Sequence, residues 1–175
     1  MIAIGTGANH EFLKALPHVF GATISYTLIV LFSGAGIGAF ITDRPNVAQI
    51  IQYAGTVYLL YLSYKISMIH PRQSDRSSSE PAVIPPGLLD GALAQGLNPK
   101  AWLVAMSGVG LFVAANSSQI FYLAIFGVIS FIFCFLGIGA WAMGGRIIGQ
   151  YLTKPVHHTI FNVTMGGMLA FCVLL

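Results

Sequence analysis

The stretch Gly96-Leu97-Asn98-Pro99-Lys100-Ala101-Trp102 stands at the middle of a segment that is otherwise apolar from about residue 88 to residue 115. Pro99 removes a backbone donor and clashes with the preceding turn of a helix. An uncompensated lysine costs roughly 2.5 to 3.5 kcal/mol at the centre of a membrane helix. The stretch therefore predicts a helix that is broken near residues 98–100, and the unfavourable charge at the break predicts a working site.

The composition around this stretch is typical of a membrane protein. Of the 175 residues, 56% are hydrophobic and 7% are charged, whereas a soluble domain carries about 25% charged residues. The lysines and arginines lie in short clusters between apolar runs. They indicate orientation in a membrane rather than a nucleic-acid partner. Cys134 and Cys172 each stand alone in an apolar run, which favours packing over metal binding.

Several apolar runs are long enough to cross a bilayer, which requires about 20 residues. We predict an all-α integral membrane protein with a single transmembrane domain over residues 1–175. Its five transmembrane helices are expected at about 15–41, 47–64, 88–115, 120–143 and 159–175. Residues 65–86 are polar and predict a loop, and residues 146–158 predict a basic turn.

The basic residues outside the apolar runs predict the orientation of these helices. Six fall before the first helix, between the second and third, or between the fourth and fifth: Lys14, Lys65, Arg72, Arg76, Arg146 and Lys154. The opposite side has Arg44 alone. Because cytoplasmic loops are enriched in lysine and arginine, the amino terminus and the loop 65–86 are expected in the cytoplasm and the carboxyl terminus outside.

An order of glycine and aromatic residues recurs between the first and fourth predicted helices. Phe20-Gly21 is followed by Gly36-Ile37-Gly38, and Phe126-Gly127 is followed by Gly137-Ile138-Gly139. If the second and fifth helices also match, the third helix needs a partner helix ahead of the first. Residues 1–7 would be the end of that partner helix. A three-helix unit that is repeated once is inverted in the membrane. We therefore expect the remnant of a six-helix, three-plus-three inverted repeat, although short glycine patterns also arise by chance in membrane helices.

These residues resemble the LysE/RhtB-type amino-acid exporters, six-helix carriers of the bacterial inner membrane. The matching parts are Gly91 with Gly96-Leu97-Asn98-Pro99-Lys100-Ala101, Ala54-Gly55 with Tyr58-Leu59-Leu60-Tyr61-Leu62, and Gly166-Gly167 with Leu169. The resemblance covers essentially the whole chain, but the Pro-Gly-Pro motif of the family's first helix has no counterpart here. It implies export of small amino acids of the threonine, homoserine and lysine class, in exchange for protons and without a cofactor, and it is compatible with a homodimer.

The break near Pro99 suggests how such a substrate would bind. A half-helix that begins at Ala101 and Trp102 would offer free N–H groups to a carboxylate, and carbonyls near residues 94–96 that lose their partners would accept from an ammonium group. The predicted substrate-binding residues are Gln95, Gly96, Asn98, Pro99 and Lys100. In the structural alternative, Pro99 is only a kink and Lys100 extends to the membrane interface.

Titratable groups near the break are candidates for proton coupling, namely Lys100 and Asp90. An acid in the first turn of a helix is also favoured by the helix dipole, so Asp90 has a structural alternative. The histidines His10, His18, His157 and His158 are expected near the cytoplasmic face in interfacial roles.

Enzyme motifs are absent from the sequence, as are nucleotide-binding motifs. We therefore expect secondary transport rather than catalysis, with no catalytic residue and no metal site. The competing interpretations are a non-transporting, truncated remnant and a membrane scaffold or assembly subunit.

Overall fold

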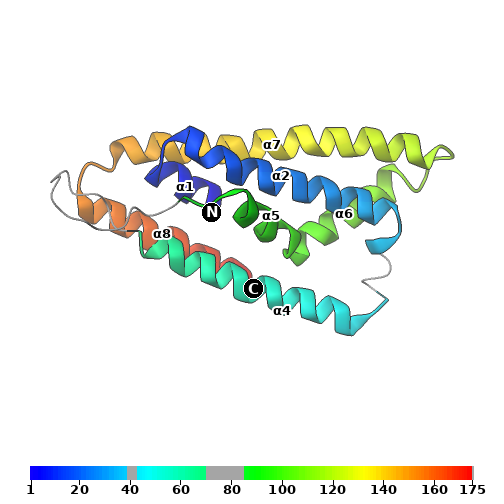
Figure 1. The fold of residues 1–175 in the computed structure, drawn as a ribbon, viewed down its shortest axis with the longest axis horizontal. Coiled ribbons are helices and arrows are strands. Elements are labelled where there is room, and N and C mark those ends of the chain that lie inside the picture. Colours follow the sequence, from blue (N-terminus) through cyan, green and yellow to red (C-terminus); the bar gives the residue numbers. More distant parts are fainter. Residues whose placement is uncertain (39–42, 70–84, 175) are drawn as a thin grey trace.

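The computed structural model describes residues 1–38, 43–69 and 85–174, and this part of the chain is helical with no strand (Figure 1). The helices are α1 (Ile2–Asn9), α2 (Phe12–Gly34), α4 (Pro45–Ser67), α5 (Leu88–Gly96), α6 (Pro99–Phe112), α7 (Gln119–Tyr151) and α8 (Pro155–Leu174). The predicted all-α class is confirmed. Arg72 and Arg76 of the predicted cytoplasmic loop lie outside the described residues.

Three of these helices are long and apolar enough to cross a membrane: α2, α7 and α8. Helix α4 has 23 residues, but Gln49, Gln52 and Lys65 lower its mean hydropathy. Helices α5 and α6 have 9 and 14 residues, so only the two together, at about 35 Å, reach the thickness of a bilayer core. Of the five spans expected from the sequence, three are therefore present as single apolar helices, and the five-span arrangement remains a prediction.

Helix α7 is longer than the sequence suggested. It has 33 residues and continues through Arg146 to Tyr151, so the prediction of a turn beginning at Arg146 is wrong. The reason is the packing of α1, because a Cβ atom on Gly145 would collide with the backbone carbonyl of Ile4. The glycines at this end of α7 make room for another helix instead of ending their own.

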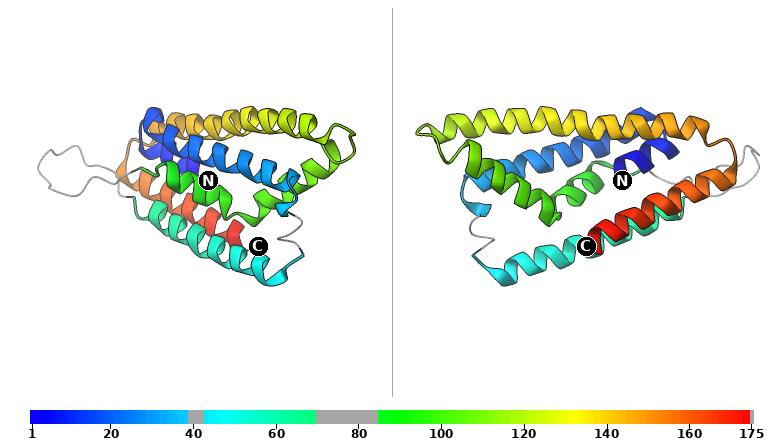
Figure 2. Two further views of the ribbon diagram at one scale, coloured as in Figure 1. Left: turned by 45° about the vertical axis from the view of Figure 1, so that its right-hand side comes forward. Right: turned by 180° about the vertical axis from the view of Figure 1, so that it is seen from behind.

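The helices are arranged around α2, which contacts α5, α6 and α7, while α1 packs on α7. Helices α4 and α8 lie side by side as a separate pair, which diverges from the other helices toward the end where α4 begins (Figures 1 and 2). The turn between α6 and α7 lies at that same end, and the turn between α7 and α8 lies at the other (Figures 1 and 2).

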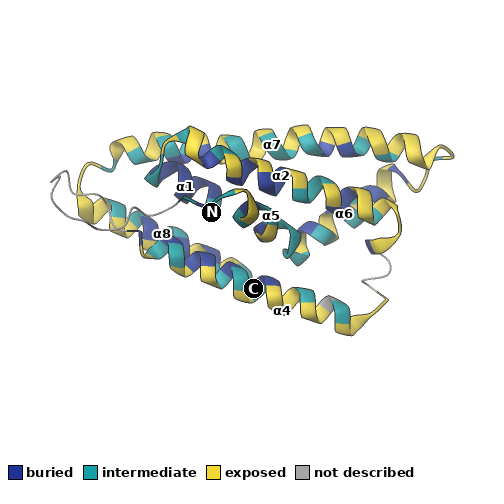
Figure 3. Cartoon of the chain, in the orientation of Figure 1, coloured by how far each residue is buried: buried dark blue, intermediate teal, exposed yellow. Residues whose placement is uncertain are grey.

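Most of the outward surface of this bundle is apolar. Exposed residues run along the whole length of α7 and along the outer side of α4 (Figure 3), and they include Ile120, Phe133 and Tyr151, which are 87%, 71% and 77% exposed. A helix that is hydrophobic on all sides belongs in a protein core or a membrane. Because α7 is not enclosed by protein, the structure defines a multi-pass membrane protein.

Candidate substrate site at the broken helix

The break predicted near residues 98–100 lies between α5 and α6, about midway along the bundle (Figure 1). Helix α5 ends at Gly96, and α6 begins at Pro99. Proline suits the first position of a helix because no N–H donor is needed there. Pro99 thus ends one helix and starts the next in the middle of the segment.

Asn98 caps the new half-helix. Its side-chain Oδ1 accepts a hydrogen bond from the backbone N–H of Lys100 at 3.0 Å, and its backbone carbonyl accepts from the N–H groups of Ala101 and Trp102 at 3.0 and 3.4 Å. The sequence predicted that the N–H groups of Ala101 and Trp102 would be free to receive a carboxylate. That prediction is wrong, because asparagine is among the strongest N-capping residues and it closes this end of α6 from within the chain.

The carbonyls upstream of the break are also engaged. The Trp102 indole Nε1 donates to the Gly96 carbonyl at 2.8 Å, and the Asn98 N–H donates to the Gln95 carbonyl at 3.1 Å. Neither carbonyl is therefore left open for a substrate ammonium group. The sequence contained a signal for this bond. A buried indole N–H usually finds a hydrogen-bond partner, and Trp102 lies only three residues after Pro99.

Lys100 extends toward α8. Its Nζ donates to the backbone carbonyl of Cys172 at 3.0 Å, in the last turn of α8. The carboxyl end of a helix carries a partial negative charge, so this position offsets part of the cost of the lysine. Cys172 contributes its carbonyl here and not its thiol.

An open cavity of about 570 Å³ lies beside the break. It is lined by residues of α2, α5, α6 and α7 and of the turn at Asn98: Tyr26, Gln95, Asn98, Lys100, Ala101, Val104, Phe126, Ile129, Ser130, Phe133 and Cys134. Ligand pockets commonly have volumes of about 300 to 1,000 Å³. Of the five predicted substrate-binding residues, the cavity brings Gln95, Asn98 and Lys100 together, whereas Gly96 and Pro99 do not line it.

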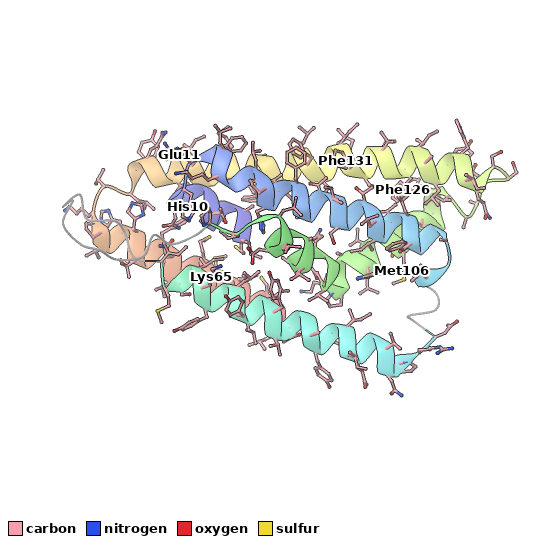
Figure 4. The ribbon with its side chains drawn as sticks, viewed as in Figure 1. His10, Glu11, Lys65, Met106, Phe126 and Phe131 are labelled. Carbon is pink, nitrogen blue, oxygen red and sulfur yellow. The ribbon has the colours of Figure 1, made fainter. Side chains whose placement is uncertain are left out.

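A second hollow of about 300 Å³ adjoins this cavity between α6 and α7. The two share Phe126 and Ile129, and the second extends to Asn116 in the turn between the helices. Figure 4 shows Phe126 on α7 and Met106 on α6 in this half of the molecule. The two hollows are therefore neighbours on the stretch between the break and the turn that joins α6 to α7.

Asp90 lies away from this cavity, in the first turn of α5. Its Oδ2 accepts from the backbone N–H of Gly87 at 2.7 Å, and its Oδ1 accepts from the Tyr58 hydroxyl of α4 at 3.2 Å. The first contact is the structural role that the sequence allowed. The second was not predicted, because Tyr58 and Asp90 are separated by 32 residues.

Two further results concern titratable side chains. His18, predicted to be interfacial, is buried inside the bundle at 3% exposure. Among the described residues, no cluster of histidine, cysteine or acidic side chains is able to hold a metal ion.

Discontinuous helices such as the α5–α6 pair are typical of secondary transporters, and comparisons with known proteins agree. The chain matches the LysE type translocator family over residues 1–175 and belongs to that family. It is thus a translocator of the membrane and not an enzyme.

Curated relatives of the chain are efflux proteins. A leucine efflux protein of Salmonella typhimurium is 26% identical over 179 aligned residues, which cover 94% of this chain and 77% of the relative. The leucine efflux protein of Klebsiella pneumoniae is 28% identical over 113 residues, covering 64% of this chain and 53% of the relative. No solved structure matches the chain.

Proposed function

We propose that this chain is a secondary transporter that exports amino acids across the bacterial inner membrane. The observation that carries the proposal is Lys100, a cation beside a helix break at mid-depth that lines a cavity together with Gln95 and Asn98. Membership of the LysE type translocator family and the efflux role in the names of its relatives support the same conclusion.

The substrate carboxylate binds to the Lys100 ammonium group. Since the backbone N–H groups at the start of α6 are already bonded, Lys100 is the strongest anion ligand at the break. Its present partner is a neutral carbonyl, that of Cys172, and a charge-assisted bond to a carboxylate is roughly twice as strong as a neutral one. The side-chain carbonyl of Gln95 is placed to accept from the substrate ammonium group.

The side chain of the substrate lies against the apolar wall of the cavity, formed by Val104, Phe126, Ile129 and Phe133. No acidic residue is found among the described residues that line the cavity, so a cationic side chain would have no partner, and an unpaired charge in a poorly solvated site is costly. Within the threonine, homoserine and lysine class suggested by the sequence, lysine therefore fits least. A neutral amino acid with an apolar side chain, such as leucine, fits best.

The packing supports a three-plus-three inverted repeat. If α1 corresponds to the α5–α6 segment and α2 to α7, then the contact of α1 with α7 corresponds to the contacts of α5 and α6 with α2, and both are extensive. The basic residues in the first turn of α2, near the end of α4 and on either side of the end of α7 favour a cytoplasmic location for that end of the bundle. Proton exchange and a homodimer remain predictions.

Efflux from preloaded cells tests this function. Cells that express the chain and contain labelled leucine should lose it faster than vector controls, and Lys100→Ala should slow this loss at least tenfold. Lys154→Ala is the matched control, because it removes a similar charge from an exposed position between α7 and α8 and should not slow efflux.

The possible results separate the parts of the proposal. Equal rates of leucine efflux from cells with the Lys100→Ala variant and from cells with the unmodified chain would show that Lys100 has no role in transport. Faster loss of lysine than of leucine would contradict the apolar substrate class. No loss above the vector control for any of leucine, threonine, homoserine and lysine would favour the non-transporting or scaffold interpretation.

A further inference from the structure

A buried imidazole lies where α2 and α5 are in closest contact. A Cβ atom on Gly91 would collide with the backbone carbonyl of His18, and one on Gly21 would collide with that of Leu88, so the two helix backbones touch at this level. The His18 side chain is enclosed there, at 3% exposure, and its Nδ1 atom has no hydrogen-bond partner. A buried polar atom without a partner is unfavourable, and such a cost points to a function.

Asp90 is the acid at this level of the interface. It precedes Gly91, the residue that lies against the His18 backbone carbonyl, so Asp90 and His18 lie at the same height along α5 and α2. Oδ1 of Asp90 accepts from the Tyr58 hydroxyl at 3.2 Å, and the same hydroxyl lies 3.4 Å from the Asp90 backbone carbonyl. This carboxylate thus connects α4 with α5 at the level where α5 touches α2.

The charge of the pair favours the binding of one proton, whereas burial of the imidazole by itself opposes its charged form. With a neutral imidazole and an ionised carboxylate the pair has a charge of −1, and an added proton makes it neutral overall. An uncompensated charge inside the membrane is costly. Among the described residues, the other charged group that acts on the His18 ring is the amino group of Met1, ahead of α1, and Tyr58 of α4 is the group that bonds the carboxylate.

We propose that His18 and Asp90 together bind the proton that is exchanged for the amino acid, and that Tyr58 transmits the protonation of this pair to α4. The inference rests on the proposed function, because it assigns the site of proton coupling in the same transporter. Lys100, the other candidate for proton coupling, then serves the substrate alone.

The link to α4 gives the proton a mechanical effect. Without the proton, the ionised carboxylate accepts the Tyr58 hydroxyl and holds α4 against α5. When the proton is shared between His18 and Asp90, the carboxylate becomes a weaker acceptor, and this contact loosens. Helix α4 also approaches the break itself, where Gly55 lies against the Leu97 carbonyl. Loosening of α4 therefore changes the packing beside the substrate cavity, and no covalent bond is made or broken.

Nuclear magnetic resonance on protein labelled with ¹⁵N-histidine tests the pair without requiring transport. The His18 signal is identified as the one missing from the His18→Gln variant, and its protonation is followed as the pH is changed. In Asp90→Asn the proton affinity of His18 should fall at least tenfold, because the attracting charge is lost. In Tyr58→Phe it should rise, because the carboxylate loses a competing donor.

The control for this titration is Asp43→Asn, which removes an acid from an exposed turn ahead of α4 and should leave the His18 titration unchanged. An Asp90→Asn midpoint equal to that of the unmodified protein would overturn the pairing. A His18 ring that stays neutral at every pH at which the protein is folded would overturn the proposal as well.

Proteoliposomes then separate this inference from the proposed function. Asp90→Asn should retain exchange of labelled for unlabelled amino acid and lose at least tenfold in amino-acid-driven proton movement. If both processes persist in Asp90→Asn, the coupling role is overturned and the exporter stands. If the unmodified protein exchanges no amino acid, the exporter fails, and the histidine titration alone decides whether the proton site exists.

Discussion

Gly166 and Gly167 are neighbours in α8 that differ sharply in their surroundings. A Cβ atom on Gly166 would meet the Ser67 hydroxyl and would lie 2.6 Å from the Ser63 carbonyl of α4, whereas a Cβ atom on Gly167 would have nothing within 4 Å. The buried Ser63 hydroxyl also donates to the Gly166 carbonyl at 2.7 Å. Replacing each glycine with alanine therefore tests how closely α4 and α8 must pack.

The expected difference follows from three contributions. Alanine is favoured over glycine inside a helix by up to about 1 kcal/mol, and both variants gain this. At Gly166 the new methyl group meets a backbone carbonyl, which rotation of a side chain does not relieve, and such overpacking costs typically about 1 to 3 kcal/mol. Weakening of the Ser63 hydrogen bond adds about 0.6 kcal/mol, the average for such bonds between membrane helices.

We therefore expect Gly166→Ala to lower the free energy of unfolding by roughly 1 to 3 kcal/mol and Gly167→Ala to raise it by up to about 1 kcal/mol. The measurement is reversible unfolding in mixed micelles of fixed composition, followed by circular dichroism. A Gly166→Ala variant as stable as Gly167→Ala would refute the close packing of α4 on α8. Gly167→Ala is the matched control, since it makes the same chemical change one residue away.

Three other changes test the contacts around the break and the end of the bundle. Asn98→Ala should lower the free energy of unfolding by about 1 kcal/mol. Asn98→Ser should keep the stability of the unmodified protein and most of its efflux, because serine also caps helices. Complete loss of efflux in the serine variant would contradict a capping role. Trp102→Phe should cost about 1 to 2 kcal/mol, because the last carbonyl of α5 loses its donor, and an unchanged unfolding midpoint in denaturant would contradict this. Asn9 and Asn162 bond each other through both amides, at 2.7 and 3.1 Å, so a double-mutant cycle to alanine should show a coupling of at least about 0.5 kcal/mol, and additive effects would contradict it.

The features that the sequence predicted correctly have local causes. Asn98 and Pro99 act on their own backbone and on the next turn, so the position of the break could be derived from seven consecutive residues. The all-α class follows from the amount and distribution of apolar residues, which hardly depend on how the helices pack. The cap at Asn98 was also available from local rules, since asparagine before a proline is a strong signal for a helix start.

The features that the sequence did not predict depend on distant partners. Lys100 bonds a carbonyl 72 residues away, and Asn9 bonds Asn162 across 153 residues. Glycines are ambiguous for the same reason. The predicted turn began at Arg146, directly after Gly145, and only the position of Ile4 beside Gly145 explains why α7 continues. His18 likewise has no local signal that distinguishes an interfacial histidine from a buried one.

In the proposed function, the capped break changes the location at which a substrate is recognised. With the N–H groups of α6 bonded by Asn98, the charge of Lys100 has to replace the helix end as the anion ligand, and Lys100 is also bonded to the end of α8. A carboxylate that binds Lys100 therefore competes with the Cys172 carbonyl.

The same reasoning applies to α4, which is joined to α5 through Tyr58 and Asp90. Helices α4 and α8 pack against each other as a pair, and each is joined to the broken segment by a hydrogen bond to a charged side chain. In the proposed mechanism the amino acid weakens one of these bonds and the proton weakens the other. Because each bond connects the same pair of helices to the same broken segment, either ligand alone loosens the pair. Movement of the pair when one of the two ligands is bound is the physical condition for their exchange.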